Sequence, residues 1–380
     1  MTLLGKTILI GVTGSIAAVE TVRLIHALRR KGAQVQPVMS QAACNIIHPD
    51  ALTYASGREA IVRITGNVEH VTYCGDEGRA DLFLIAPCTA NTISKIACGI
   101  DDTTVTTCAT TALGRKMPFI VVPAMHHAMF RHDIVMKNLA ILKESGIEIV
   151  GPRIEEGKAK IADINEIVLW CERLLSRRPL AGKRILITSG RCEEPVDDIR
   201  ILTTRSSGKM GRELAYEAFR RGADVTIIHQ DTIPVGRNIP VTSAASMGDA
   251  IRSVLDDHTP DIYISAAAIS DFAPERITGK IPSGKPVSLY LHPLPKLLDL
   301  ALGVIPVTIA FKLGPAAHHE AQELLQKGVT MVLANTPDNL GSETARYTMI
   351  DVYGEEHISG NKQEIASRIF DRISTRYLSS

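Results

Sequence analysis

Three segments in the first half of the chain have the composition of ligand-binding turns. Gly14-Ser15 follows an apolar run, Ala86-Pro87-Cys88-Thr89-Ala90-Asn91-Thr92 follows a second run, and Pro123-Ala124-Met125-His126-His127-Ala128-Met129 follows a third. Glycine permits a tight turn, and Ser or Thr caps a helix whose N-terminal amides bind phosphate. Ligands of open parallel sheets bind at such strand ends. The segments therefore predict a phosphate-bearing ligand, with ordinary helix caps as the alternative.

The histidines of this half suggest acid–base chemistry more than metal binding. His70 lies in an expected turn ahead of the third apolar run, and an imidazole there is either a general base or a surface residue. His126, His127 and His132 have no carboxylate at ligand spacing. A metal site is therefore not expected at these three residues.

The second half carries a different set of polar strand ends. Ser189-Gly190 follows its first apolar run, and Ser206-Ser207-Gly208-Lys209 opens an expected helix as an anion cradle, without the first glycine of a Walker A loop. The small residues Ala266, Ala267 and Ala268 precede Asp271 at a third strand end. Further cations, an aromatic ring and an amide follow at Lys280, Phe311, Lys312, Lys327 and Asn335. One carboxylate among several cations suits a nucleoside triphosphate bound with Mg²⁺, and Asp271 is the residue expected to hold the metal ion.

The elements that position these residues alternate strand and helix in both halves. The opening at residues 5–10 recurs at residues 182–187, and Arg177-Arg178-Pro179 interrupts a helix between them. We therefore expect domains at residues 1–178 and 179–380, each α/β: two tandem Rossmann-like three-layer domains with mostly parallel sheets. Strands are expected at residues 8–12, 34–39, 81–86, 118–123, 147–150, 184–188, 224–229, 261–266, 308–311, 331–334 and 347–352. The main helices are expected at residues 16–31, 92–99, 132–145, 209–221, 246–258, 296–302, 315–327 and 362–377, with an irregular functional loop at residues 273–286.

Composition excludes several classes of protein. The chain has 380 residues, 45% hydrophobic and 22% charged, and a net charge of +1, which predicts neither nucleic-acid nor membrane partners. No apolar run reaches the roughly 20 residues that cross a bilayer. The seven cysteines form no CxxC pair, which favours free thiols in a reducing cytoplasm.

The motifs of the first half together resemble the homo-oligomeric flavin-containing Cys decarboxylases. The resemblance lies in Gly14-Ser15-Ile16-Ala17-Ala18, His70 and the segments that begin at Ala86 and Pro123. It implies that His70 is the active-site base and that Met125, His126 and Met129 bind substrate, with His126 in place of a common Asn. The implied FMN site comprises Gly14, Ser15, Ser40, Ala86, Pro87, Thr89, Asn91, Thr106 and Thr107. In this family the flavin oxidises the substrate's CH₂–SH unit to a thioaldehyde that accepts the electrons released with CO₂.

One family feature is missing from the first half. Many members carry a proton-donating Cys in a mobile clamp after the PAM segment, but the matching residues 151–160 contain none. Lys158 or Lys160 is left as the acid, or as a partner of the substrate phosphate. The alternative is a protein in which only the second half is active, or a regulatory flavin-binding domain.

The second half resembles the 4′-phosphopantothenate–cysteine ligases, which share an SSGKMG segment, an AAxxD[FY] strand end and a KI-containing loop. The resemblance implies CTP as cosubstrate, an acyl-cytidylate intermediate, and Lys280 as a phosphate or acyl-transfer lysine. Asp271 would face the cytidine or Mg²⁺. The implied substrate site comprises Ser189, Gly190, Thr204, Ser206, Ser207, Gly208, Lys209 and Met210, and Thr204 stands where many members have Asn. The implied nucleotide site comprises Ala266, Ala267, Ala268, Asp271, Lys280, Phe311, Lys312, Lys327 and Asn335.

Both resemblances in this order imply a bifunctional fusion of coenzyme A biosynthesis. Its expected partners are the small molecules 4′-phosphopantothenate, cysteine, CTP and 4′-phosphopantothenoylcysteine. The resemblance also implies a homo-oligomer, and a dodecamer of flavin-domain trimers linked by ligase-domain dimers is the candidate assembly.

Overall fold

The computed structural model describes residues 1–155, 157–335 and 344–378. The chain divides into two compact units, Met1–Arg177 and Arg178–Ser380, which are described separately below. Within the described residues, no helix has the length and apolar character needed to span a bilayer. All seven cysteines are free thiols.

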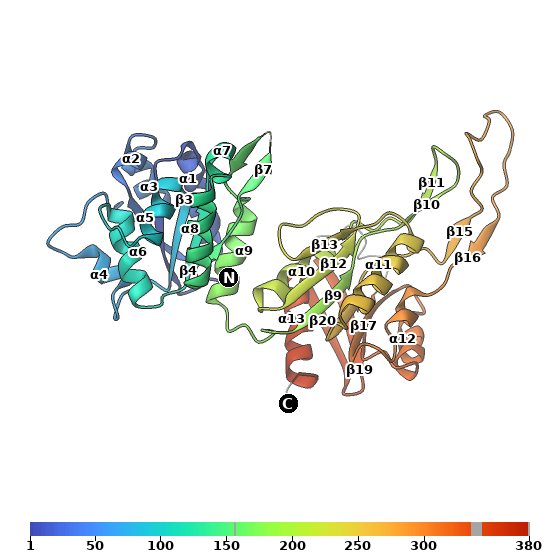
Figure 1. Ribbon diagram of the computed structural model, residues 1–380. Helices are drawn as coiled ribbons and strands as arrows, with labels where there is room; N and C mark the ends of the chain where they lie inside the picture. The colour runs from blue at the N-terminus through green and yellow to red at the C-terminus, as the bar shows by residue number, and fades with distance from the viewer. Residues whose placement is uncertain (156, 336–343, 379–380) are drawn as a thin grey trace. The chain divides into compact units, whose positions relative to one another are not determined.

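The first unit is a parallel five-stranded sheet with helices on both faces (Figure 1). Its order, β2-β1-β3-β4-β6, is the doubly wound order in which the ligand binds beside β1 and β3. The strands are β1 (Thr7–Val12), β2 (Gln34–Met39), β3 (Leu82–Cys88), β4 (Phe119–Pro123) and β6 (Glu148–Ile149). Every residue of β3 is buried, as expected for a central strand covered on both faces.

Two apolar clusters, one on each face, hold these layers together. The first packs α1 (Thr21–Arg30), α3 (Pro49–Ser56) and α9 (Ile164–Leu175) on the sheet. The second packs α4 (Glu69–Cys74), α5 (Ala90–Ala97), α6 (Thr104–Gly114) and α8 (Asp133–Glu144) on the opposite face. Short helices α2 (Gln41–Cys44) and α7 (His127–Phe130) follow β2 and β5 (Met125–His126).

Two expectations for the first unit are wrong in detail, and one small sheet was not expected. The helix expected at residues 16–31 is a 3₁₀ turn, η1 (Ile16–Glu20), followed by α1, and the Thr21 hydroxyl donates to the Ala86 carbonyl at the join (3.3 Å). His70 lies in the first turn of α4 and not in an irregular turn. A small sheet of order β5-β8-β7 was not expected: β5 (Met125–His126), β7 (Arg153–Glu155) and β8 (Lys158–Lys160).

The second unit contains an eight-stranded sheet of order β13-β12-β9-β14-β17-β18-β19-β20. Its first six strands are parallel and have the dinucleotide-binding order 3-2-1-4-5-6, and β19 and β20 close it as an antiparallel hairpin. The strands are β9 (Arg184–Thr188), β12 (Asp224–His229), β13 (Arg237–Pro240), β14 (Ile262–Ser265), β17 (Val307–Leu313), β18 (Met331–Asn335), β19 (Thr344–Asp351) and β20 (Gly354–Asn361). The fold class read from the sequence is thus confirmed, although β13 and β20 were not expected.

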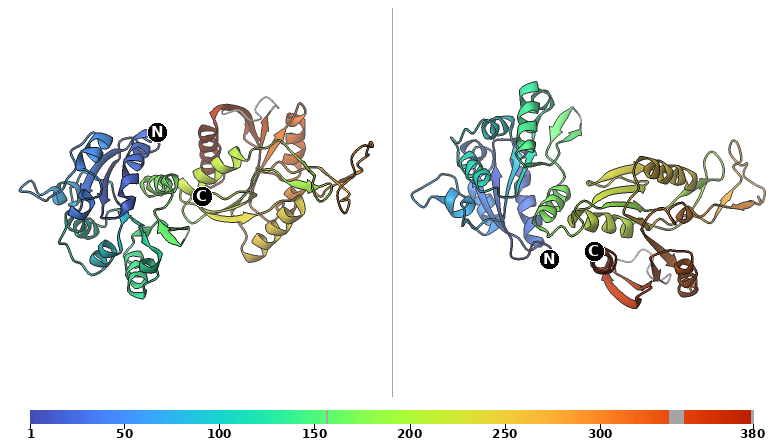
Figure 2. Two further views of the ribbon diagram at one scale, coloured as in Figure 1. Left: turned by 90° about the horizontal axis from the view of Figure 1, so that it is seen from above. Right: turned by 60° about the horizontal axis from the view of Figure 1, so that its bottom comes forward.

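Helices cover the second sheet, and two thin ribbons leave it. The helices are α10 (Lys209–Arg220), α11 (Ala244–Asp257), α12 (Ala317–Gln326) and α13 (Lys362–Arg376), with a 3₁₀ turn η2 (Leu297–Leu300) where a helix at 296–302 was expected. The ribbons pair β10 (Glu193–Pro195) with β11 (Ile201–Thr203), and β15 (Phe272–Pro274) with β16 (Leu291–Pro293). Both ribbons extend beyond the body of this unit in the views of Figures 1 and 2. Of the segment expected to be irregular, residues 273–274 lie in β15, and residues 275–286 have no helix or strand, as expected, in the connection from β15 to β16.

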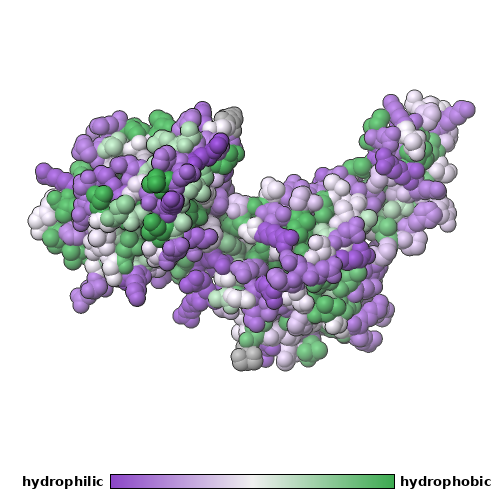
Figure 3. Space-filling view, in the orientation of Figure 1, coloured by the Kyte–Doolittle hydropathy of each residue, from purple (hydrophilic) through white to green (hydrophobic). Residues whose placement is uncertain are grey.

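The ribbons expose apolar side chains that the sheet does not cover. The most exposed include Ile199 (66%) and Tyr290 (72%), with Ile201, Phe272 and Leu289 between 44% and 49%. Figure 3 shows apolar residues on this projecting part of the surface among polar ones.

Candidate active sites

The C-terminal edge of the first sheet brings together the turns that follow β1, β2 and β3. Thr13 links two of them, because its hydroxyl donates to the Pro87 carbonyl (2.8 Å) and accepts from the Thr89 amide (3.0 Å). The Ser40 amide donates to the Val12 carbonyl (3.0 Å). Sequence reasoning missed Thr13, although a hydroxyl at the end of a buried apolar strand was a usable signal.

Hydroxyl side chains cap the segments that start at this edge. Ser15, Ser40 and Thr89 accept hydrogen bonds from the amides of Ala17 (3.4 Å), Ala43 (3.3 Å) and Thr92 (3.3 Å). Three N-terminal ends with partly unpaired amides thus converge beside β1, which is favourable for an anion. Asn91 is exposed on the first turn of α5.

Helix α6 starts at the same edge. The Thr104 hydroxyl donates to the Met39 carbonyl at the end of β2, next to Ser40. Thr106 is buried and closes a capping box with Thr103, and the Thr107 hydroxyl donates to the Thr103 carbonyl (2.9 Å). The structure therefore places Thr106 and Thr107 near Ser40, but with their hydroxyls engaged in the helix start.

The turn after β1 is packed too tightly for any side chain at position 14. A Cβ on Gly14 would lie 2.6 Å from the Cβ of Ala42, which belongs to α2. The backbone of the turn and the start of α2 are therefore in direct contact, and together they form a compact cradle beside β1. Such a cradle fits the phosphate of a flavin nucleotide.

Substitution of Gly14 by alanine should open this cradle. Because Ala42 is short and fixed by α2, the extra methyl group must displace the Ser40–Cys44 turn, and a strain of roughly 1–3 kcal/mol corresponds to a loss of flavin affinity of about 5- to 150-fold. Fluorescence titration of the apoprotein with FMN measures the affinity. Gly114→Ala is the control, because a methyl group at this position of α6 would have no atom within 4 Å; equal affinities in the two variants would contradict the cradle.

His70 has an unsatisfied buried atom. Its Nδ1 is buried and has no hydrogen-bond partner among the described residues. It follows Val68, a β-branched residue with φ of 47°, and Glu69, whose carboxylate accepts from the Thr65 amide (2.8 Å). Helix α4 packs against α6, where a hydrogen bond to Cys74 raises the pKa of Cys108. A strained, fixed helix start thus presents an imidazole with a free ring nitrogen.

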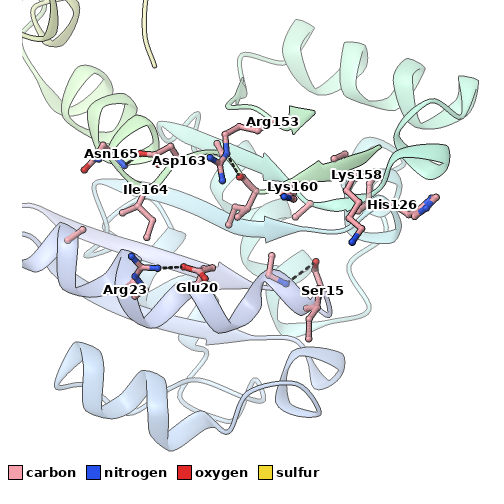
Figure 4. A pocket seen from close by; sticks show the side chains of 18 of the residues that line it. Ser15, Glu20, Arg23, His126, Arg153, Lys158, Lys160, Asp163, Ile164 and Asn165 are labelled. Carbon is pink, nitrogen blue, oxygen red and sulfur yellow. Dashed lines mark hydrogen bonds and ion pairs between the residues drawn. The ribbon is translucent and has the colours of Figure 1, made fainter. Parts of the chain in front are cut away.

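A cavity of about 760 Å³ lies between η1–α1 and the small β5-β8-β7 sheet. Figure 4 shows Ser15, Lys158 and His126 at one end, and Arg23, Ile164 and Asn165 at the other. His126 and Lys158 are directly opposite in the ladder between β5 and β8. The segment without a Cys is therefore joined to the PAM segment by strand pairing, and both border one cavity.

The tautomer of the neutral His126 ring follows from its local hydrogen bond. Its Nδ1 accepts from the Ala128 amide (3.2 Å), as the N-cap of α7. Nδ1 therefore carries no proton in the neutral ring, and Nε2–H is a donor. Met125 is half-buried, and Met129 is 50% exposed.

Other cavity residues gave no motif in the sequence. Arg23 pairs with Glu20 (3.3 Å), and the Arg153 Nε donates to the Ile161 carbonyl (3.2 Å). In the sequence, these charged residues resemble those of any solvated helix face or hairpin. Only tertiary contact places them at one cavity. The described residues include no group of three or more His, Cys, Asp or Glu side chains that could hold a metal ion.

In the second unit, Ser189, Gly190 and the Ser206–Gly208 turn line one small cavity of about 120 Å³. The buried Ser189 hydroxyl donates to the Gly208 carbonyl (3.2 Å), and Gly208 has φ of 68°. Arg212 and His229 also line this cavity, and burial lowers the pKa of His229. Neither was expected from the sequence.

Two substrate-binding candidates have limited freedom. Met210 is 9% exposed in the first turn of α10, which leaves only its backbone for a ligand. The Thr204 hydroxyl donates to the Ala268 carbonyl (3.2 Å), so it remains an acceptor. Lys209 is the first residue of α10.

The expected nucleotide residues are only partly brought together. Ala266 and Ala268 donate backbone bonds to Thr188 (3.0 Å) and Gly190 (2.8 Å), which joins the end of β14 to the end of β9. Phe311, Lys312 and Asn335 lie near the ends of β17 and β18, and Lys312 pairs with Glu320 (3.0 Å). The Asp271 carboxylate pairs with Lys296.

The position expected for Lys327 is wrong. It is the C-cap of α12, which follows β17 and runs back across the sheet, so Lys327 lies by the start of β18, where the Thr330 amide donates to Thr308 (2.9 Å). A helix between parallel strands always returns to the opposite edge. Lys327 is therefore not at the strand ends with Phe311 and Asn335.

Lys280 is also separate from that edge. It is exposed in the segment between β15 and β16, and its neighbours bond to the turn between β10 and β11. No contact within the described residues brings it to Ser206 or Ala268.

These features define a two-unit α/β enzyme with a flavin-type edge in one unit and a nucleotide-type edge in the other. Residues 2–176 match the family model "Flavoprotein", and residues 180–377 match "DNA/pantothenate metabolism flavoprotein C-terminal domain". The coenzyme A biosynthesis bifunctional protein CoaBC of Thermococcus kodakarensis is 43% identical, over 98% of this chain and 95% of its own. That of Methanocaldococcus jannaschii is 36% identical, over 97% and 93%. The chain belongs to the family of coenzyme A biosynthesis bifunctional proteins.

A solved structure is similar to the second unit. It is the crystal structure of the C-terminal domain of coenzyme A biosynthesis bifunctional protein CoaBC, with 26% identity and a TM-score of 0.45, covering 53% of this chain and 100% of that chain.

Proposed function

We propose that the second unit joins 4′-phosphopantothenate to cysteine with CTP, and that the first unit decarboxylates the product to 4′-phosphopantetheine. The relatives named as bifunctional match nearly the full length of this chain, which supports the order of the two activities. The observation that carries the decarboxylase half is the unpartnered Nδ1 of His70.

FMN is the flavin that we assign to the first unit. The cradle of Gly14, Ser15 and Ser40 would hold its phosphate, and the Pro87–Thr89 segment would border the rest. When bound, FMN supplies two-electron oxidation and reduction, which gives the electrons of the breaking C–C bond a place to go.

The residues of the first unit then bind substrate and move protons. Nδ1 of His70 accepts a proton from the CH₂–SH unit, since no other group in the described chain competes for this atom. Nε2–H of His126 donates to the substrate carboxylate. Lys158, directly opposite His126, is the proton donor that we place where relatives have a Cys.

The ligase half is argued from the second cavity and the strand ends. The amides and hydroxyls at Ser189, Gly190 and Ser206–Gly208 suit the phosphate of phosphopantothenate. The nucleotide is assigned to Ala266–Ala268, Phe311, Lys312 and Asn335. The substrate carboxylate displaces pyrophosphate from CTP, and the cysteine amine then displaces CMP; Mg²⁺ and Asp271 in this step stay part of the proposal.

One incubation tests both halves. Protein, phosphopantothenate, cysteine and either CTP or ATP are combined, and products are identified by mass. We expect phosphopantothenoylcysteine and then phosphopantetheine with CTP. If the first product accumulates without release of CO₂, the ligase-only alternative is correct. Light scattering of the same sample tests the proposed homo-oligomer and its dodecameric form.

Replacement of His126 by alanine should raise the barrier to decarboxylation. Loss of one hydrogen bond to a charged group costs about 1.5–3 kcal/mol, or roughly 10- to 100-fold in kcat/KM. CO₂ release from phosphopantothenoylcysteine measures this. His132→Ala is a matched control, because the His132 Nδ1 caps α8 through the Ile134 amide at the same 3.2 Å; a similar loss in both variants would mean that His126 only caps its helix.

A further inference from the structure

The segment that carries Lys280 is attached to the turn between β10 and β11. The Ile277 amide donates to the Val196 carbonyl (3.0 Å), and the Asp198 amide donates to the Gly279 carbonyl (3.2 Å). Backbone bonds thus run between residues 277–279 and residues 196–198, which are about 80 positions apart in the chain.

Two consecutive carboxylates complete this attachment on either side of Lys280. Asp198 Oδ2 accepts from the Gly279 amide (3.1 Å), and Asp197 Oδ2 accepts from the Ile281 amide (3.0 Å). The Arg200 guanidinium pairs with Asp197 and reaches the Ile281 carbonyl (3.5 Å). The residues before and after Lys280 are therefore both held by charged groups.

The chemical state of Asp197 fits this arrangement. The hydrogen bond from the Ile281 amide, followed by those from Ile199 and Arg200, holds the pKa of Asp197 below its ordinary value. The carboxylate is consequently ionised at neutral pH and is a strong acceptor.

Lys280 itself is exposed, and within the described part of the chain nothing bonds its ammonium group. It lies between Gly279, with φ of 82°, and Ile281, in a segment that also contains Gly284. Such a segment has many accessible conformations unless it is attached elsewhere. Attachment at residues 279 and 281 restricts the backbone of Lys280 while its four-carbon side chain stays mobile.

We propose that Asp197 and Asp198 are positioning residues for Lys280 in the ligase reaction. In this assignment they contact none of the ligase substrates. They act by lowering the conformational entropy that Lys280 loses when it engages the acyl or phosphoryl group. The inference rests on the proposed ligase function and on the role of Lys280 in it.

Asp198 is the more informative of the two residues. Asp197 is buried and also accepts from the amides of Ile199 (2.8 Å) and Arg200 (2.6 Å), so its loss would disturb its own turn. The Asp198 side chain is 47% exposed and, among the described residues, bonds only to the Gly279 amide and to Arg276 (2.9 Å). Arg276→Ala removes that ion pair and keeps the backbone bond.

The experiment compares Asp198→Ala, Asp198→Asn, Arg276→Ala, Lys280→Ala and Asp198→Ala/Lys280→Ala in the full chain. Pyrophosphate release with CTP, phosphopantothenate and cysteine gives kcat and KM, and hydrogen exchange reports the amides of residues 275–285. Asp249→Ala is the control, because Asp249 pairs with Arg252 (2.8 Å) on an exposed helix face.

We expect Asp198→Ala to lower kcat by about 10- to 100-fold with KM for CTP unchanged, and to speed exchange at residues 279–281. Asp198→Asn should recover part of kcat, since its carbonyl still accepts, and Arg276→Ala should resemble the control. In the Lys280→Ala background the Asp198 change should have no further effect.

Two results overturn the inference in distinguishable ways. If Lys280→Ala keeps full activity, the role of Lys280 in the proposed function fails, and positioning fails with it. If Lys280→Ala is inactive but Asp198→Ala matches Asp249→Ala, or lowers activity equally in the Lys280→Ala background, positioning alone is wrong.

Discussion

Replacement of His70 by asparagine is expected to lower the decarboxylation rate by about 100- to 10,000-fold while FMN stays bound. The amide preserves polarity and approximate size but has no nitrogen that accepts a proton near neutral pH. The Nδ1 of His70 makes no hydrogen bond within the described residues, so its replacement removes none, and the flavin edge should keep its structure. Single-turnover CO₂ release and the visible absorbance of the bound flavin measure the two effects.

His48→Asn is the comparison for this variant. His48 is also a histidine near a helix start, and its Nδ1 accepts from the Asp50 amide (3.3 Å) at the N-cap of α3. It should retain normal turnover. Retention of activity in His70→Asn would show that His70 is not the base, whereas loss of flavin absorbance would assign it to cofactor binding.

Among glycine-to-alanine substitutions in the ligase unit, Gly211→Ala is expected to be the most damaging. A Cβ at position 211 would lie 2.2 Å from Ser189 Oγ and 2.4 Å from Ser189 Cβ, and Ser189 is only 2% exposed. The start of α10 must therefore move away from β9, at a cost of roughly 1–3 kcal/mol. Because this contact also shapes the Ser206–Gly208 turn, ligase activity should be lost, as measured by pyrophosphate release.

A paired substitution separates packing from chemistry. In Ser189→Gly/Gly211→Ala the methyl group occupies the space of the lost hydroxymethyl group, so the free energy of unfolding of the second unit should recover. The Ser189 hydroxyl, which donates to Gly208 (3.2 Å), is absent from this variant. Ligase activity should stay low. Recovery of both properties would show that Ser189 matters only through its volume.

The strand–helix alternation was readable because buried parallel strands are continuous apolar runs. Residues 82–85 are an example, and every residue of β3 is buried. Edge elements were not readable in this way. Strands β13 and β20 and the two ribbons have half-exposed, mixed sequences, and Tyr290 and Ile199 are apolar but exposed. The local hydrophobic pattern predicts little about a strand when one face of that strand does not pack against a core.

The site residues divide on the same physical basis. Residues at strand ends, such as Gly14, Thr89, Ser189 and Gly208, have local roles as turns and caps, and their types already indicate those roles. Lys327 was grouped with the strand ends, although the last residue of a helix between two parallel strands must lie at the opposite edge of the sheet.

Motifs and their order in the chain were enough to indicate two different α/β units, a flavin-type turn in the first and an SSGKMG cradle in the second. Contacts between distant segments were needed for the rest. These are the unpaired Nδ1 of His70, the pairing of His126 with Lys158, and the attachment of the Lys280 segment to Asp197 and Asp198. Turn and cap preferences act within a few residues, whereas such contacts depend on how separate elements pack, which no local pattern encodes.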